Sequence, residues 1–146
     1  MREFEFYLQK GEVKKVSKDI ALANALLKNI TKRLNSLKKL NPKDDAEMFF
    51  ENSYDCIREV CDAVLAVKGY KSYSHIASIT YLKKVGFNDS LIIKLDSFRA
   101  KRNGSKYYGE EILKQDSEEI EEFIKTEFKN IVHKAEKIMS EEKWEY

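Results

Sequence analysis

The chain lacks the patterns that mark membrane-spanning and secreted proteins. Its 146 residues contain no apolar run of near twenty residues, and charged residues alternate with phenylalanine from the start, so neither a transmembrane helix nor a signal peptide is expected. The formal net charge of +2 is too small for bulk attraction to nucleic acid, so any phosphate binding must come from local clustering. We expect one cytoplasmic domain covering residues 1–146, without a membrane segment.

Cysteine is scarce, and the two that are present do not form a recognisable site. Cys56 and Cys61 are five residues apart in a helical stretch, which places them roughly 140° apart around the helix axis. They cannot bridge each other there. The sequence has no Cys-x-x-Cys pair and no quartet of Cys and His, so a zinc site or a redox pair is not supported. We expect two buried thiols, no metal and no cofactor.

Strand-like alternation is also missing after the first few residues, and helix signals dominate. Residues 1–16 are predicted to be a lead-in segment with at most a short helix, because Gly11 follows Phe4 and Phe6 too soon for a useful strand. After a cap at Ser17 or Asp19, apolar residues recur every three or four positions up to residue 37, which indicates an amphipathic helix. Later helices are predicted from Asn41-Pro42 to Gly69, over about 75–85, from Asn88 or Asp89 to Gly109, and from Asp116 to about 140. The tail, 141–146, is expected to be frayed.

The second of these helices carries an acidic ridge of four carboxylates that fall within about 80° of one another on a helical wheel. Its members are Glu51, Asp55, Glu59 and Asp62. Helical di-iron proteins use Glu-x-x-His, whereas the residue three after Glu59 is Asp62, so a metal centre is disfavoured. We expect the ridge to supply solvated ion-pair partners.

The segment from Arg99 to Gly109 holds four cations, an asparagine and two adjacent tyrosines. Arg102 continues an apolar helical stripe, and a buried guanidinium is costly without a partner, so either a ligand or a carboxylate must supply negative charge. Gly104 costs about 1 kcal/mol relative to Ala in a helix interior, which suggests a close approach or a kink. A purely structural alternative stays open, in which the cations favour the helix C-terminus and the tyrosines fill core or interface space.

Two segments together resemble a known family. Arg102-Asn103-x-x-x-Tyr107-Tyr108-Gly109, preceded by a long helix and by Gly-Tyr-Lys-Ser-Tyr-Ser-His over residues 69–75, is similar to an archaeal-type variant of the HEPN family. The resemblance covers roughly residues 17–140. It implies an up-and-down bundle of four to five helices that forms a homodimer, with an Arg, a polar neighbour and a downstream His in a cleft at the two-fold interface. Many members are metal-independent endoribonucleases or toxins of toxin–antitoxin pairs, often encoded beside a small nucleotidyltransferase, and others only bind RNA or nucleotides.

The chain departs from the family at the downstream histidine. Tyr107 stands five residues after Arg102, where catalytic members carry His, and a phenol with a pKa near 10 is a poor base at neutral pH. His75 is a possible substitute, although a structural or capping role is favoured for it. His133 is given no role.

Two functional hypotheses follow from these residues. The first is binding of RNA or a nucleotide, with ribonuclease activity left open. Its predicted catalytic residues are Arg102, Asn103 and Tyr107, and its predicted nucleic-acid contacts are Arg99, Lys101, Lys106 and Tyr108. The alternative is a protein-interaction module that docks onto a nucleotidyltransferase or another protein partner, with the tyrosines as contact surface.

Overall fold

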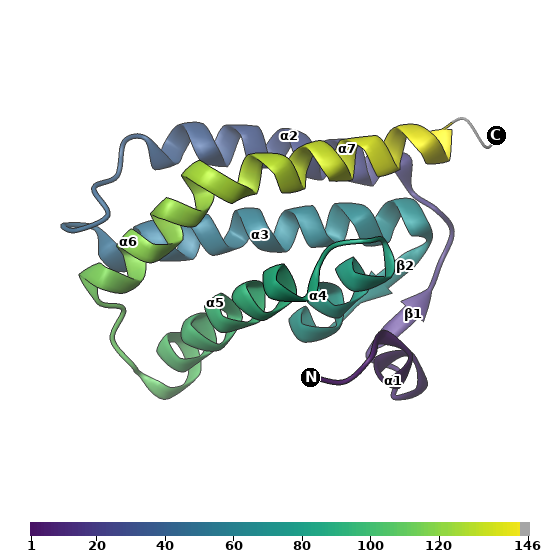
Figure 1. Ribbon diagram of the computed structural model, residues 1–146, viewed down its shortest axis with the longest axis horizontal. Coiled ribbons are helices and arrows are strands. Elements are labelled where there is room, and N and C mark those ends of the chain that lie inside the picture. The colour runs from purple at the N-terminus through teal and green to yellow at the C-terminus, as the bar shows by residue number, and fades with distance from the viewer. Residues whose placement is uncertain (144–146) are drawn as a thin grey trace.

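A long central helix, α3, organises an all-α, up-and-down bundle (Figure 1). The computed structural model describes residues 1–143. In chain order its elements are α1 (Phe4–Gln9), β1 (Val13–Lys15), α2 (Ile20–Leu37), α3 (Ala46–Lys68), β2 (Tyr70–Ser72), α4 (His75–Lys84), α5 (Asp89–Tyr108), α6 (Lys114–Phe123), the π-helical turn η1 (Ile124–Phe128) and α7 (Lys129–Lys143). The fold class predicted from the sequence is confirmed.

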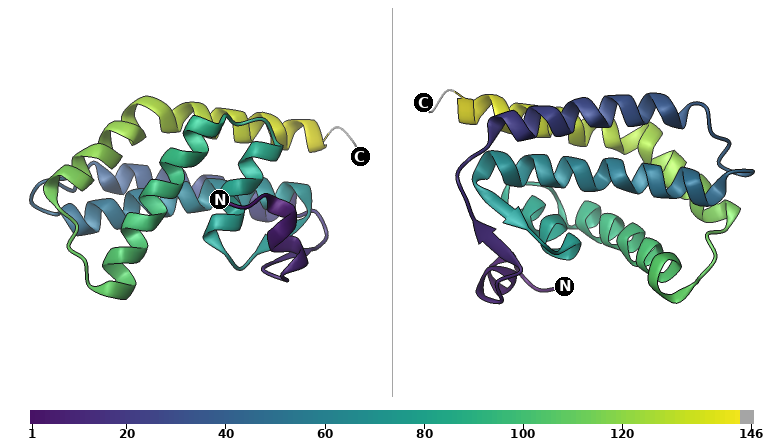
Figure 2. Two further views of the ribbon diagram at one scale, coloured as in Figure 1. Left: turned by 60° about the horizontal axis from the view of Figure 1, so that its bottom comes forward. Right: turned by 180° about the vertical axis from the view of Figure 1, so that it is seen from behind.

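Helix α3 is buried around most of its circumference because other helices cover both of its sides. In Figures 1 and 2, α2 and α7 lie on one side of α3, and α4 and α5 lie on the other. The two predicted apolar stripes of α3 are both buried, from Phe49 and Phe50 through to Val67. No helix within residues 1–143 combines the length and the apolar composition that crossing a bilayer requires.

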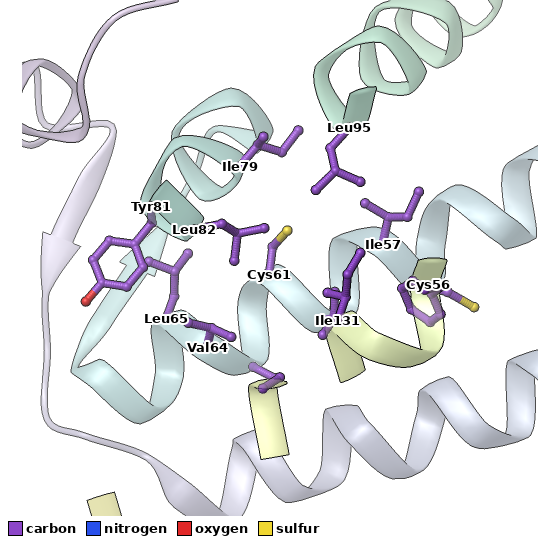
Figure 3. Packing of buried hydrophobic residues seen from close by; sticks show 14 of the residues in the cluster. Cys56, Ile57, Cys61, Val64, Leu65, Ile79, Tyr81, Leu82, Leu95 and Ile131 are labelled. Carbon is purple, nitrogen blue, oxygen red and sulfur yellow. The ribbon is translucent and has the colours of Figure 1, made fainter. Parts of the chain in front are cut away.

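Both cysteines are free thiols in this core, as expected. Figure 3 shows the sulfur of Cys61 among the side chains around Leu82, while the side chain of Cys56 points in another direction along α3. Burial raises the pKa of Cys56 to about 12, and it raises the pKa of Cys61 as well. Neither thiol is therefore a thiolate at neutral pH, which fits a packing role.

The first sixteen residues are more integrated than a lead-in segment. Helix α1 is the short helix that was expected, and it buries Phe4 and Tyr7, which are three residues apart and so share a face. Strand β1 then pairs antiparallel with β2, with Val13 opposite Ser72. This pairing was missed because the two strands are only three residues each and are far apart in the sequence.

Two helix starts differ from the predicted positions because local side chains close turns ahead of the helix. The amides of Lys43 and Asp44 donate to Asn41 Oδ1, so the chain turns there and α3 begins only at Ala46. Helix α6 begins earlier than predicted, at Lys114. Asp116 is not the capping residue but lies inside the first turn, where its carboxylate accepts a hydrogen bond from the backbone amide of Leu113. The ends at Gly69 and Gly109 are confirmed, each glycine having a positive φ.

The last helical segment contains a π turn, η1, which the sequence analysis did not predict. Phe123 and Phe128 are both 1% exposed although they are five residues apart. In an α-helix this spacing separates two side chains by roughly 140°, whereas a wider π turn returns them to one face. The five-residue spacing between two core aromatics is the sequence signal that was available.

The predicted frayed tail is wrong for residues 141–143, which continue α7. Glu142 is 3% exposed and accepts hydrogen bonds from Lys18 at 2.7 Å and Lys68 at 2.6 Å. These bonds lower the pKa of Glu142 to about 2, so the carboxylate stays charged and ties α7 to the end of α3 and to the segment just before α2. Residues 144–146 of the predicted tail lie outside the described residues.

Candidate functional site

Arg102 is held in the core-facing side of α5. Leu95, Phe98 and Arg102 follow one another at spacings of three and four and are all buried, with Arg102 only 6% exposed. Arg102 thus ends an apolar stripe of α5, as its spacing from Leu95 and Phe98 predicts.

The guanidinium of Arg102 has few partners for so buried a charge. Its Nε lies 3.5 Å from Glu51 Oε2, and its Cζ lies 5.6 Å from the centre of the Tyr54 ring. Nε is buried without a hydrogen bond to any of residues 1–143. The glutamate side chain is 28% exposed, so water competes for it. The sequence left a ligand or a carboxylate as the source of negative charge. The described chain supplies a carboxylate, but the contact distance is long and the carboxylate is partly solvated.

His75 lies on the same side of α3 as Arg102, at the start of α4, which packs against α5. It is the first residue of α4, and the preceding Ser74 caps that helix by accepting from Ala77 N, so the imidazole is not the cap. Its Nδ1 instead lies 3.5 Å from the hydroxyl of Tyr54. Tyr54 therefore contacts both His75 and Arg102, and it links α4 to α5 through α3.

The electrostatic surroundings of His75 are positive. Burial, followed by the charges of Arg58, Arg102 and Arg99, lowers the pKa of His75 to about 4, although Asp55 acts in the opposite direction. The imidazole is therefore neutral at neutral pH. We call Arg58, Arg99 and Arg102 the arginine cluster.

The carboxylates near the arginine cluster pair with its members unevenly. Arg99 Nε lies 2.6 Å from Asp96, and Arg102 has the long contact with Glu51. Arg58 forms no ion pair within 4.0 Å among residues 1–143, although its charge acts on the carboxyl of Asp62. Arg102 and Arg58 are therefore the less closely paired members of the cluster.

The acidic ridge of α3 supplies ion-pair partners, as predicted for most of its members. Glu59 is less solvated than expected, being only 8% exposed, and its carboxylate accepts from Arg33 Nε at 2.6 Å. Asp62 is half-buried, and burial raises its pKa to about 6. Within the described chain, no group of His, Cys, Asp and Glu is arranged to hold a metal ion.

Of the remaining predicted site residues, only Asn103 adjoins the arginine cluster. Asn103 is half-buried next to Arg102, and Lys101 Nζ lies 3.3 Å from Asp116. Tyr107 and Tyr108 are 67% and 80% exposed. Because five residues turn an α-helix by roughly 140°, Tyr107 does not share the face of Arg102. Lys106 is exposed as well.

Gly104 lies where the chain turns back over the end of α5, since its carbonyl accepts from the amides of Gly109 and Glu110. A β-carbon at this position would meet the carboxylate of Glu110, the end of an exposed side chain that can move aside. The close approach suggested by the sequence is therefore an approach to a movable side chain.

Two members of the candidate site, Tyr54 and Arg58, were not identified from the sequence. They are four residues apart on α3 and so share a face, but their spacing is typical of any amphipathic helix. Only the packing of α4 and α5 against that face gives them a role.

Comparison with protein-family models finds no match to this chain, and comparisons with curated proteins and with solved structures find none either. The resemblance to the HEPN family therefore stays a prediction from the residues.

Proposed function

We propose that this protein binds the phosphate groups of RNA or of nucleotides at the arginine cluster. The observation that supports this most strongly is the buried Arg102: among residues 1–143 its Nε has no hydrogen-bond partner, and its one ion-pair carboxylate, Glu51, lies at 3.5 Å. A phosphate oxygen is the kind of partner that a guanidinium binds with short, charge-assisted hydrogen bonds. Arg99 shares the face of Arg102 within about 60°, so both can contact one ligand.

In this proposal Glu51 contacts Arg102 in the free protein, and phosphate displaces it on binding. Its carboxylate is partly exposed and can swing into water when phosphate arrives, so the displacement is inexpensive. Arg102 would then stabilise negative charge on a phosphoryl group in a partly dry setting, where such help is most effective.

Any proton transfer in a cleavage reaction is assigned here to His75 and not to Tyr107. The imidazole is neutral at neutral pH and lies within the field of the arginine cluster, whereas the phenol of Tyr107 is exposed on another face of α5. A pKa of about 4 makes His75 a weak base, so we propose binding as the main activity and slow endoribonuclease activity as secondary. A HEPN-like homodimer that completes the cleft is part of this proposal, and sedimentation analysis tests it.

The test is fluorescence anisotropy with an end-labelled single-stranded RNA, at two salt concentrations and with inorganic phosphate as competitor. Arg102→Ala should weaken binding by about tenfold or more, since a charge-assisted hydrogen bond contributes about 1.5–3 kcal/mol, and it should lower the salt dependence. The matched control is Arg2→Ala, an exposed arginine near the N-terminal end of α5, away from the C-terminal half of that helix where Arg102 lies. Equal affinities for wild type, Arg102→Ala and Arg2→Ala would remove the proposal.

The exposed pair Tyr107 and Tyr108 supports a second candidate function. Two adjacent phenol rings at 67% and 80% exposure form a surface that suits protein contacts. We propose a protein partner, such as a nucleotidyltransferase, at this tip of α5. Co-purification that is lost in the Tyr107→Ser, Tyr108→Ser double variant would support it, and co-purification that is retained would oppose it.

A further inference from the structure

An apolar groove of about 650 Å³ lies on the side of α3 opposite to the arginine cluster, between α2 and the last helical segment. This volume is within the roughly 300–1,000 Å³ that is typical of small-molecule sites. Its apolar lining comes from Ile30, Leu34, Leu37, Leu40, Phe49, Ile124, Phe128 and Val132.

The groove exists because the last helical segment bends away from α2. Figure 1 shows α7 running beside α2 in the opposite direction, whereas α6 diverges from α2 and lies over the N-terminal end of α3. The change of direction occurs at η1, and both Ile124 and Phe128 of that turn line the groove. Single π turns within α-helices recur at functional sites, and here the turn contributes two side chains to the groove.

The charges around the groove are unevenly distributed. Three lysines line it, Lys38 just after the end of α2, Lys125 in η1 and Lys129 at the start of α7. Two carboxylates line it as well, Glu121 near the end of α6 and Glu136 further along α7. Lys125 lies 3.5 Å from Glu121 and is thereby partly neutralised. Lys38 and Lys129 have no carboxylate within 4.0 Å in the part of the chain described, so two positive charges beside the apolar lining have no close ion-pair partner there.

The lining is mainly apolar, and besides the lysines its polar members are Thr31, Glu121, His133 and Glu136. Thr31 is the one lining hydroxyl, and it donates to the carbonyl of Leu27 within its own helix. A ligand that matches an apolar floor and these two lysines has an aliphatic body and one negative group. We propose that the groove binds a long-chain aliphatic carboxylate, with its chain on the apolar lining and its carboxylate near Lys38 and Lys129.

This inference is independent of phosphate binding, because the groove and the arginine cluster lie on opposite sides of α3. The probe is dodecanoate, measured by isothermal titration calorimetry on the full chain. Octanoate, decanoate and n-dodecanol serve as comparison ligands. Because burying a methylene contributes about 0.8 kcal/mol, each two-carbon extension should tighten binding by up to about fifteenfold. The alcohol should bind more weakly than the acid.

Two kinds of variant locate the ligand. Leu34→Trp fills the groove and should abolish binding. The double variant Lys38→Glu, Lys129→Glu changes only exposed side chains, so it keeps the fold, and it should weaken dodecanoate by about tenfold while leaving dodecanol unchanged. The matched control is Lys32→Glu, an exposed lysine of α2 that does not line the groove. Arg102→Ala should bind dodecanoate as wild type does.

Several results would overturn the inference. These are absence of dodecanoate binding to the wild type, equal loss in the double variant and in Lys32→Glu, or equal affinity for acid and alcohol. A change of oligomeric state in Leu34→Trp, measured by sedimentation, together with unchanged dodecanoate binding, would mean that another copy of the chain covers the groove.

Discussion

The substitution Arg102→Met separates an arginine kept for ligand binding from one kept for stability. Methionine fills a similar elongated volume without a charge. The loss comprises the contact with Glu51, which for a partly exposed carboxylate at 3.5 Å contributes up to about 1 kcal/mol, and the contact with the Tyr54 ring at 5.6 Å, which contributes about 0.5–2 kcal/mol.

The gain comes from removing a buried donor that has no partner. Leaving such a group unsatisfied costs about 1–3 kcal/mol, and Nε of Arg102 is in this situation. The two sides nearly cancel. We therefore expect the free energy of unfolding of Arg102→Met to lie within about 1 kcal/mol of wild type, while RNA binding weakens by about tenfold or more, as in Arg102→Ala.

The control is Arg33→Met, which removes a better-paired arginine. Arg33 Nε donates to Glu59 at 2.6 Å, and Glu59 is 8% exposed, so the substitution leaves a buried carboxylate without its partner. This variant should lose about 2–4 kcal/mol. Urea denaturation followed by far-ultraviolet circular dichroism measures both. A loss of about 3 kcal/mol or more in Arg102→Met would refute the reasoning, because Arg102 would then be a structural ion-pair residue.

Three further predictions concern groups with shifted pKa values. Glu142→Gln should lower the free energy of unfolding by about 1–3 kcal/mol at neutral pH, because two charged hydrogen bonds weaken while the lysines stay partly hydrated. Since the folded pKa of Glu142 is about 2, thermal melts across pH should show this wild-type advantage disappearing as pH falls from about 4.5 toward 2. Asp62→Asn should raise the free energy of unfolding at neutral pH by about 1–2 kcal/mol, because a folded pKa of about 6 means that the fold disfavours the charged form of Asp62. Urea titrations should show no gain below about pH 3.8, and a loss of stability at neutral pH would contradict the prediction. His75, with a folded pKa of about 4 against 6.5 when unfolded, should make wild-type stability fall as pH drops from about 6.5 to 4; His75→Gln should remove that part of the slope, and an unchanged slope would place the imidazole in water.

Local signals predicted most of the fold. The glycines at 69 and 109, the cap at Asn88 and the apolar spacing of α2 and α3 each depend on neighbouring residues, so the sequence displays them directly. The pairing of β1 with β2 and the burial of Glu142 depend on partners far along the chain. Such partners leave no local pattern.

The candidate site was predicted in part, for the same reason. Arg102 was identified because it interrupts an apolar stripe on its own helix, which is a local feature. The proximity of His75 and Arg58 to it depends on how α4 and α5 pack on α3, and no spacing within one helix reveals that. Tyr107 was chosen by its distance in sequence from Arg102, but helical geometry turns it to another face.

The most direct measurement of the central claim is the position of a phosphate in crystals soaked with a short RNA dinucleotide. The account predicts a phosphate oxygen within about 3 Å of the Arg102 guanidinium, with the Glu51 carboxylate moved away into solvent. Phosphate density elsewhere on the molecule, with Glu51 still beside Arg102, would contradict it.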